Sequence, residues 1–393
     1  MQMNKTSWRL IPFYVLYHIT NCFYQNYFTV YLNQQGHGEA AIGMIMALAP
    51  LASLLGQPVW GSLGDRLQYK NTLLRVLILC SAAVFALLAF VRTVWLIGVL
   101  VCVYAFFYMS IQPMADTITF ESLDRENLPF GPVRMSATLS FAFMSLIAGT
   151  FMLAHLNYLT WIVPAALFGT FLVTWAMPPV RGHRTKKDAG MLTLLKYKPL
   201  VWMLAFNVAM MLGMSFFYNF YSIYFTRDLG GSSQALGLAY FISAMSEIPF
   251  LIYGDRIFKR FGAGVMLLVS AAMMAVRWFI TASLGSPTAA LWTQLLHSGC
   301  FLMMTFATSK YINAVAPDAL KAAGQLLYTL FTLGVSRIAG SFIGGQIAQR
   351  FGIRTLFVCG GTLTLAAVVV FGVYIVKNFD VLRRASAGEM KIS

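Results

Sequence analysis

Apolar runs of about 20 residues recur along the whole chain, separated by short polar or basic connections. A hydrocarbon core of ~30 Å needs about 20 helical residues per crossing, so the pattern predicts membrane-spanning helices. A β-barrel is disfavoured because its strands alternate apolar and polar positions over about 10 residues. The predicted spans are twelve, at 8–33, 40–63, 71–91, 94–117, 132–154, 157–177, 199–225, 233–254, 263–284, 288–312, 320–348 and 352–377.

Basic residues predict the orientation of these spans. The amino terminus, the connections after even-numbered spans and the carboxyl tail hold 22 of the 28 Lys and Arg. Because the basic side of a membrane protein stays cytoplasmic, both termini are predicted to be cytoplasmic in a cell membrane. The net charge of +15 then faces anionic lipid headgroups, and we expect no nucleic acid partner.

A polar, basic linker at 178–198 divides the apolar chain six spans to six. The two halves contain similar segments: NYFTVYL and GDRLQYK in the first half correspond to NFYSIYF and GDRIFKR in the second. We therefore predict an all-α membrane protein of two parallel-repeat six-helix bundles, 1–177 and 199–393. That architecture resembles the major facilitator superfamily, whose substrate sites lie near the bilayer midplane between the halves.

The segment GSLGDRLQYK is similar to the loop motif that follows the second span in that superfamily, although Gln68 replaces a usual glycine. The resemblance implies a gate that holds the cytoplasmic side closed, whereas topogenic charge alone is the plainer interpretation. The gate residues predicted in the two halves are Gly61, Asp65, Arg66, Lys70, Asp255 and Arg256.

Charged residues inside the spans are the main candidates for chemistry. Asp116 and Arg134 each lie nine residues from Arg125. At 1.5 Å per residue both reach a depth of ~13 Å if the hairpin turns at Arg125, so they can pair across antiparallel helices. A satisfied ion pair that only fixes packing is the structural alternative.

The second half carries arginines within its apolar runs, at Arg277 and Arg337. A lone cation at the bilayer centre costs roughly 3 kcal/mol on insertion scales and is tolerated mainly in a protected polar interior. Arg277 and His297 lie ten residues on either side of Pro287, which predicts equal depth near the midplane. Glu247 is expected at a comparable level.

The stretches FGPVRM, QPVWGSLGD, MAVR, LLH and SKYI resemble those of the lactose permease group. The overall pattern is even more similar to the phenylpropionate and nucleoside or sugar proton symporters. The resemblance implies that Asp116 and Arg134 bind substrate hydroxyls. It also implies that Glu247, Arg277 and His297 couple proton and substrate. Arg337 is added to the predicted proton-coupling residues because it too lies inside an apolar span, although an ion pair that only fixes packing is the alternative for it.

Three positions depart from the permease pattern. Cys300 stands where the permease has its proton-carrying glutamate, and Gln294 where it has a lysine. Phe141 stands where the permease stacks a tryptophan on its sugar and is itself predicted to bind substrate. These departures argue against galactoside specificity. Glu247 becomes the first candidate for the proton carrier and Asp116 the second.

Polar stripes on two spans add substrate-binding candidates. In the first span the polar positions recur at helical spacing on one face, although membrane bundles also use such residues for helix-to-helix hydrogen bonds. The candidates are Asn21, Gln25, Tyr218 and Asn219.

Enzyme functions are disfavoured because the chain lacks a phosphate-binding GxxxxGK[ST] loop, an HExxH pair and a GxSxG elbow. We expect neither cofactor nor metal. The sequence predicts a secondary transporter, a functional monomer that takes up a small polar solute such as a sugar or nucleoside together with protons. An aromatic carboxylate symporter, a drug or lipid antiporter and a non-transporting receptor remain alternatives.

Overall fold

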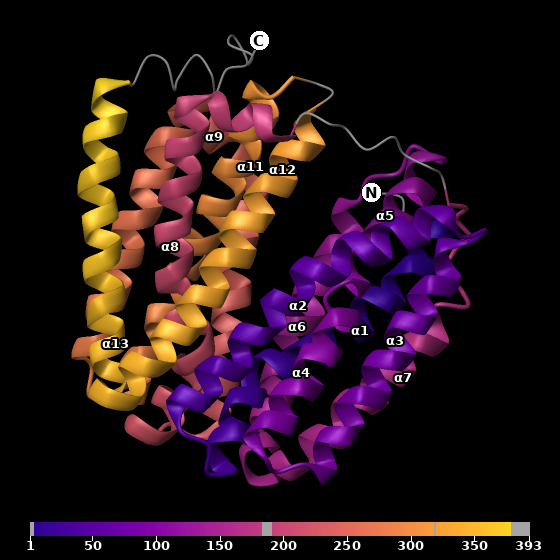
Figure 1. The fold of residues 1–393 in the computed structure, drawn as a ribbon, viewed down its shortest axis with the longest axis horizontal. Coiled ribbons are helices and arrows are strands. Elements are labelled where there is room, and N and C mark those ends of the chain that lie inside the picture. Colours follow the sequence, from indigo (N-terminus) through magenta and orange to yellow (C-terminus); the bar gives the residue numbers. More distant parts are fainter. Residues whose placement is uncertain (1–3, 183–190, 318–319, 379–393) are drawn as a thin grey trace. The chain divides into compact units, whose positions relative to one another are not determined.

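The computed structural model describes residues 4–182, 191–317 and 320–378, and the central part of the predicted linker and the carboxyl tail lie outside them. The described residues form helices and no strand, which confirms the all-α prediction (Figure 1). Every backbone N–H and C=O in a bilayer needs an internal partner, and a helix supplies these within one segment. Helix occupies the place of each of the twelve predicted spans.

The chain divides into two compact units, each with its own packing. Unit 1 comprises Met1–Lys186 and Ser232–Phe241, and unit 2 comprises Lys187–Gly231 and Ile242–Ser393. Within unit 1, α1 packs on α6 and α7, α2 packs on α4, and α3 packs on α4 and α7. The helices that lie in unit 1 are α1 (Lys5–Gln34), α2 (Glu39–Arg66), α3 (Lys70–Leu87), α4 (Val94–Tyr108), α5 (Ile111–Asp124), α6 (Gly131–Gly149) and α7 (Leu159–Val173).

Unit 2 is built around α8, which packs along α13, and around α11, which packs on α12. The first turns of α9 fall within the residues assigned to unit 1. The remaining helices are α8 (Lys198–Ile223), α9 (Ser233–Ser283), α10 (Pro287–Trp292), α11 (Met303–Val315), α12 (Lys321–Tyr328) and α13 (Ser336–Lys377).

Two of these helices extend across a tight glycine turn. α9 joins the predicted spans 233–254 and 263–284, and α13 joins the second part of span 320–348 to span 352–377. α9 has 51 residues and α13 has 42, whereas one crossing needs about 20. Gly262 and Gly352 interrupt them with φ of +72° and +83°, a conformation that glycine adopts without steric cost. Both turns coincide with predicted span boundaries. By length and composition, seven continuous helical segments of the described residues are apolar enough to cross a membrane.

The described flanks of the predicted linker are ordered by contacts in their own units. In unit 1, Lys70 N donates to Val180 O at 2.8 Å and Gly182 N donates to Leu67 O at 3.2 Å. In unit 2, a 3₁₀ turn at Met191–Lys196 precedes α8, and its Leu194 is fully buried. The predicted linker boundaries at 178 and 198 therefore include residues that belong to the two packed units.

Helical geometry is irregular at two places in unit 2 that matter for the site. Between α10 and α11 the chain passes through a 3₁₀ turn at Thr293–Leu296, then His297, then a π turn at Ser298–Leu302. A second π turn at Thr329–Val335 directly precedes α13. Such turns alter the backbone hydrogen bonding locally and occur often at functional sites.

Candidate functional site

In unit 1, Asp116 of α5 is the centre of a hydrogen-bonded group. The Tyr14 hydroxyl of α1 donates to Asp116 Oδ1 at 2.6 Å, and Gln112 Nε2 donates to the same oxygen at 2.8 Å. Thr119 Oγ1 lies 3.1 Å from the Tyr14 hydroxyl. Two donors on one carboxylate oxygen stabilise the ionised form and fix its direction, so Asp116 is oriented before any solute arrives.

Arg134 lies close enough for its charge to act on Asp116, but the described residues show no ion pair between them. The reason is the helix boundary. α6 begins at Gly131, so Arg134 is in its first turn, whereas Asp116 lies eight residues before the end of α5. The Arg134 side chain is exposed and its donors are unoccupied by any described residue. The role of this pair in binding substrate stays a prediction.

The other unit 1 candidates differ in exposure. Gln25 is exposed, while Asn21 and Phe141 are half-buried. His18, on the same polar face of α1, places Nδ1 2.9 Å from the Tyr14 carbonyl one turn earlier. Because a carbonyl only accepts, His18 Nδ1 carries the proton. His18 is thus bound to its own helix, as the plainer interpretation of the stripe expects.

In unit 2, Arg277 of α9 is fully buried. Its guanidinium donates to Gln294 Oε1 at 2.6 Å and contacts His297 Nδ1 at 3.3 Å. It also lies over the Phe217 ring, 4.4 Å from the centroid, where the ring quadrupole attracts a cation. Its Nε has no hydrogen-bond partner in the described structure, and no described carboxylate is in ion-pair contact with it. Arg277 is a buried cation held by neutral groups.

The contact with Arg277 determines which nitrogen of His297 carries the proton. A guanidinium has only donors, so His297 Nδ1 must be the acceptor. A neutral imidazole then carries its proton on Nε2, and that atom lies 3.6 Å from Glu247 Oε1. Arg277 and His297, which the sequence predicts at equal depth about Pro287, are thus in contact. Among the described residues of this network, Glu247 is the one acid that can exchange a proton.

Arg337 and Tyr218 lie next to this network. The Arg337 guanidinium lies 5.6 Å from the Tyr218 ring centroid, and that ring packs edge-on to His297 at 6.3 Å. Asn219, predicted to bind substrate, is buried and donates to Ser341 Oγ at 2.7 Å. Its observed contact joins α8 to α13. The substrate role of Tyr218 and Asn219 stays a prediction.

The predicted gate motif of unit 1 is centred on Lys70 at the start of α3. Its Nζ lies 2.5 Å from Glu121 Oε1 of α5 and 3.7 Å from Asp65 Oδ1 of α2. Arg66 is exposed. Gly61 is also exposed, and a Cβ there would meet nothing within 4 Å. This ion cluster connects α2, α3 and α5, so it can stabilise their packing at this end of unit 1.

The corresponding loop in unit 2 uses a different cation. Asp255 pairs with Lys310 of α11 at 2.7 Å, with both side chains exposed. Arg256 is exposed and lies 5.9 Å from the Tyr253 ring centroid. The two halves thus repeat an acid-to-lysine contact with unequal burial.

We expect Lys70→Met to destabilise the protein by about 1–3 kcal/mol. This range lies between the values for exposed and for buried pairs, because the two acids are about one-third exposed. Adding Glu121→Gln should restore part of the loss, since one unneutralised carboxylate is then removed. Lys310→Met is the matched control and should cost under about 1 kcal/mol. Thermal unfolding in detergent measures all three, and equal losses at Lys70 and Lys310 would refute the burial argument.

Several residues of these groups were not identified as functional from the sequence. Gln294 was noticed only as a departure from a family pattern, yet it accepts from Arg277. Glu121 was expected in the loop, yet it binds Lys70. Both residues are polar side chains within or beside apolar spans, and that was the available signal. Their partners lie far away in sequence and emerge only from the fold.

Comparison with known proteins places the chain in a family. Residues 7–359 match the family model described as "MFS_1 like family". The protein belongs to this family of the major facilitator superfamily. The resemblance stated from the loop motif and the charged residues is confirmed, and the chain is a multi-pass membrane transporter of this superfamily.

Similar proteins are transporters by their names. A "Maltose permease" of Geobacillus stearothermophilus is 25% identical over 351 residues, covering 87% of this chain and 88% of the relative. A "Probable 3-phenylpropionic acid transporter" of Escherichia coli (strain K12) is 24% identical over 364 residues, covering 90% and 93%. The crystal structure of the nucleoside transporter NupG superposes with a TM-score of 0.84 at 15% identity, covering 94% and 99%. This last likeness shows the fold.

Proposed function

We propose that this transporter carries out proton-coupled uptake of a small polar solute, a sugar or a nucleoside, by alternating access of its two halves in the cytoplasmic membrane. Both termini lie on the cytoplasmic side, and one chain suffices for transport. Solute binds at Asp116 and Arg134, and Glu247 carries the proton. The printed names of the maltose permease and the nucleoside transporter support this substrate class.

The observation that carries the proposal is the chain of contacts Gln294, Arg277, His297 and Glu247 in unit 2. Arg277 directs the His297 proton to Nε2, so His297 offers Glu247 a donor and accepts no proton itself while Arg277 stays in place. Protonation of Glu247 removes its charge beside His297. Movement of Arg277 toward a solute or an acid would free Nδ1, and the network would then change state. The state of His297 beside the Glu247 carboxyl would then depend on the position of Arg277, and this dependence could couple proton exchange at Glu247 to solute binding.

The first test is solute binding, followed by uptake. Thermal unfolding of the purified protein with maltose, uridine or 3-phenylpropionate identifies the class, because a ligand that binds the folded state stabilises it. Uptake of the bound solute is then measured in proteoliposomes with an inward proton gradient. We expect accumulation that a protonophore abolishes. Accumulation driven by an outward proton gradient would instead assign an exporter, and binding without uptake a receptor.

An aromatic carboxylate symporter is the second candidate function, favoured by one observation. Arg277 and Arg337 both lie in unit 2 without an acid in ion-pair contact among the described residues. A carboxylate solute could supply the missing charge, and the name of the phenylpropionate relative agrees with this candidate.

Gln294→Glu separates the two candidates. The new carboxylate would take the place of the Gln294 Oε1 that lies 2.6 Å from Arg277, and would neutralise that cation. Under the leading proposal we expect the affinity for a neutral sugar or nucleoside to change less than about tenfold. Under the second candidate, the affinity for a carboxylate solute should fall at least about 30-fold, which corresponds to the loss of a charged pair worth ~2 kcal/mol. Gln294→Met, which adds no charge, is the matched control in binding titrations.

A further inference from the structure

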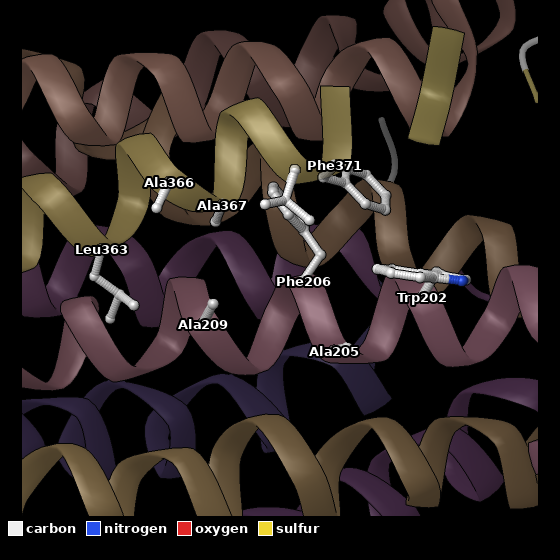
Figure 2. A pocket seen from close by; sticks show the side chains of 9 residues that line it. Trp202, Ala205, Phe206, Ala209, Leu363, Ala366, Ala367 and Phe371 are labelled. Carbon is white, nitrogen blue, oxygen red and sulfur yellow. The ribbon is translucent and has the colours of Figure 1, made fainter. Parts of the chain in front are cut away.

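A pocket of about 230 Å³ lies on unit 2 between α8 and the second half of α13 (Figure 2), and no residue of the charged network lines it. It exceeds the cavity of about 150 Å³ that holds a benzene ring in a protein interior. Trp202 and Phe206 project from α8, and Leu363, Ala366 and Phe371 from α13. The lining is almost wholly apolar, so an apolar chain suits it and a polar solute does not.

Each helix face that lines the pocket ends in a lysine. On α8, Lys198 precedes Trp202 by four residues, one helical turn on the same face. On α13, Lys377 follows Tyr374 by three residues. The Trp202 and Tyr374 rings stack at a centroid distance of 5.2 Å, which brings the two helix ends together. Both lysines are exposed.

The chemical character of these two helix faces changes along their length in the same order as the parts of a lipid molecule, from acyl chain to headgroup. The apolar pocket comes first, then an aromatic pair of the kind found at membrane interfaces, then two cations. Lys198 begins α8 and Lys377 ends α13, so both belong to the end of unit 2 that the basic-residue bias assigns to the cytoplasm. Anionic lipid headgroups of that leaflet attract such lysines by about 1 kcal/mol each.

We propose that this groove binds one anionic phospholipid, with an acyl chain in the pocket and its phosphate between Lys198 and Lys377. The bound lipid joins α8 to α13. The Asn219 to Ser341 hydrogen bond joins α8 to the other part of α13, before the Gly352 turn. This site is separate from the proposed transport chemistry.

Native mass spectrometry of the full chain tests the proposal with phosphatidylglycerol and phosphatidylcholine of identical acyl chains. We expect phosphatidylglycerol to bind at least tenfold more tightly. The double variant Lys198→Gln and Lys377→Gln should weaken the binding of phosphatidylglycerol by about 30-fold, the equivalent of ~2 kcal/mol. It should leave the binding of phosphatidylcholine unchanged. The matched control, Lys5→Gln with Lys259→Gln, removes equal charge from exposed positions elsewhere and should keep the preference.

The pocket itself is tested by filling it. Ala366→Leu adds apolar volume at an exposed, lipid-facing position, so folding should be unaffected, and both lipids should bind at least fivefold more weakly. Ala272→Leu, exposed on α9, is its control. Equal binding of the two lipids, or no effect of the lysine or leucine variants, would overturn the proposal. Glycerol 1-phosphate lacks an acyl chain. If it binds as tightly as phosphatidylglycerol, the lysines bind a soluble anion, and the lipid proposal is overturned as well.

Discussion

Replacing Glu247 with glutamine is expected to abolish proton-driven accumulation of solute while leaving exchange of solute across the membrane. The variant keeps the size and hydrogen-bonding capacity of the side chain beside His297 Nε2. It removes the one carboxyl group in the described Glu247, His297, Arg277 and Gln294 network, which is the group proposed to carry the proton. A transporter without its proton carrier can still alternate when solute occupies the site, but the proton gradient no longer drives it.

Proteoliposomes measure both activities in one preparation. With an inward proton gradient, accumulation by Glu247→Gln should fall to the level of a passive gradient, while counterflow of labelled against unlabelled solute should persist within about threefold. Asp228→Asn, an acid of the same unit that pairs with Arg227 outside the network, is the control and should accumulate normally. Loss of counterflow as well as accumulation would assign Glu247 to binding or structure. Accumulation retained in Glu247→Gln and lost in Asp116→Asn would move the proton carrier to unit 1.

The helical architecture was predictable because lipid imposes a simple rule on the backbone. Each crossing needs a long apolar helix, and polar or glycine-containing turns separate the crossings. Within α9 and α13, the predicted span boundaries fall at or beside the turns at Gly262 and Gly352. A positive φ there is a local property of the chain, and local properties are those a sequence displays most directly.

Contacts within the site were predictable only where depth alone decides them. Arg277 and His297, which the spacing about Pro287 predicts at similar depth, are in contact. The same arithmetic failed to give an ion pair for Asp116 and Arg134, because α6 starts six residues after the point assumed for the turn. A difference of six helical residues corresponds to about 9 Å, comparable with the length of an arginine side chain.

Side-chain partners across helices were not predictable, because they depend on the rotation of each helix about its axis. Tyr14 and Gln112 both donate to Asp116, and only their packed helices show it. The same holds for Gln294, where the 3₁₀ turn before His297 changes the angle between successive side chains. Without that turn, a regular helical wheel would misplace Gln294 relative to Arg277.

Replacing Arg134 with alanine is expected to remove solute binding while the protein stays folded. The side chain is exposed and makes no hydrogen bond or ion pair with the described residues, so its loss leaves no buried group unsatisfied. In the same unit Asp116 is already oriented by two donors, and a solute hydroxyl bridging Asp116 and Arg134 would complete the arrangement. Loss of a charged hydrogen-bond partner at a binding site costs about 2–5 kcal/mol, which is about 30-fold to several thousand-fold in Kd.

Titration of the solute found by thermal unfolding measures this loss, and the unfolding temperature without solute reports the fold. That temperature should change by less than a few degrees in Arg134→Ala. Arg125→Ala, an exposed arginine at the end of α5, removes the same charge from the hairpin turn and should bind normally. Arg134→Lys should recover only part of the affinity, because a lysine cannot present the two parallel donors of a guanidinium. Normal binding by Arg134→Ala would exclude Arg134 from the solute site. The arginines of unit 2 would then be the groups that recognise the solute.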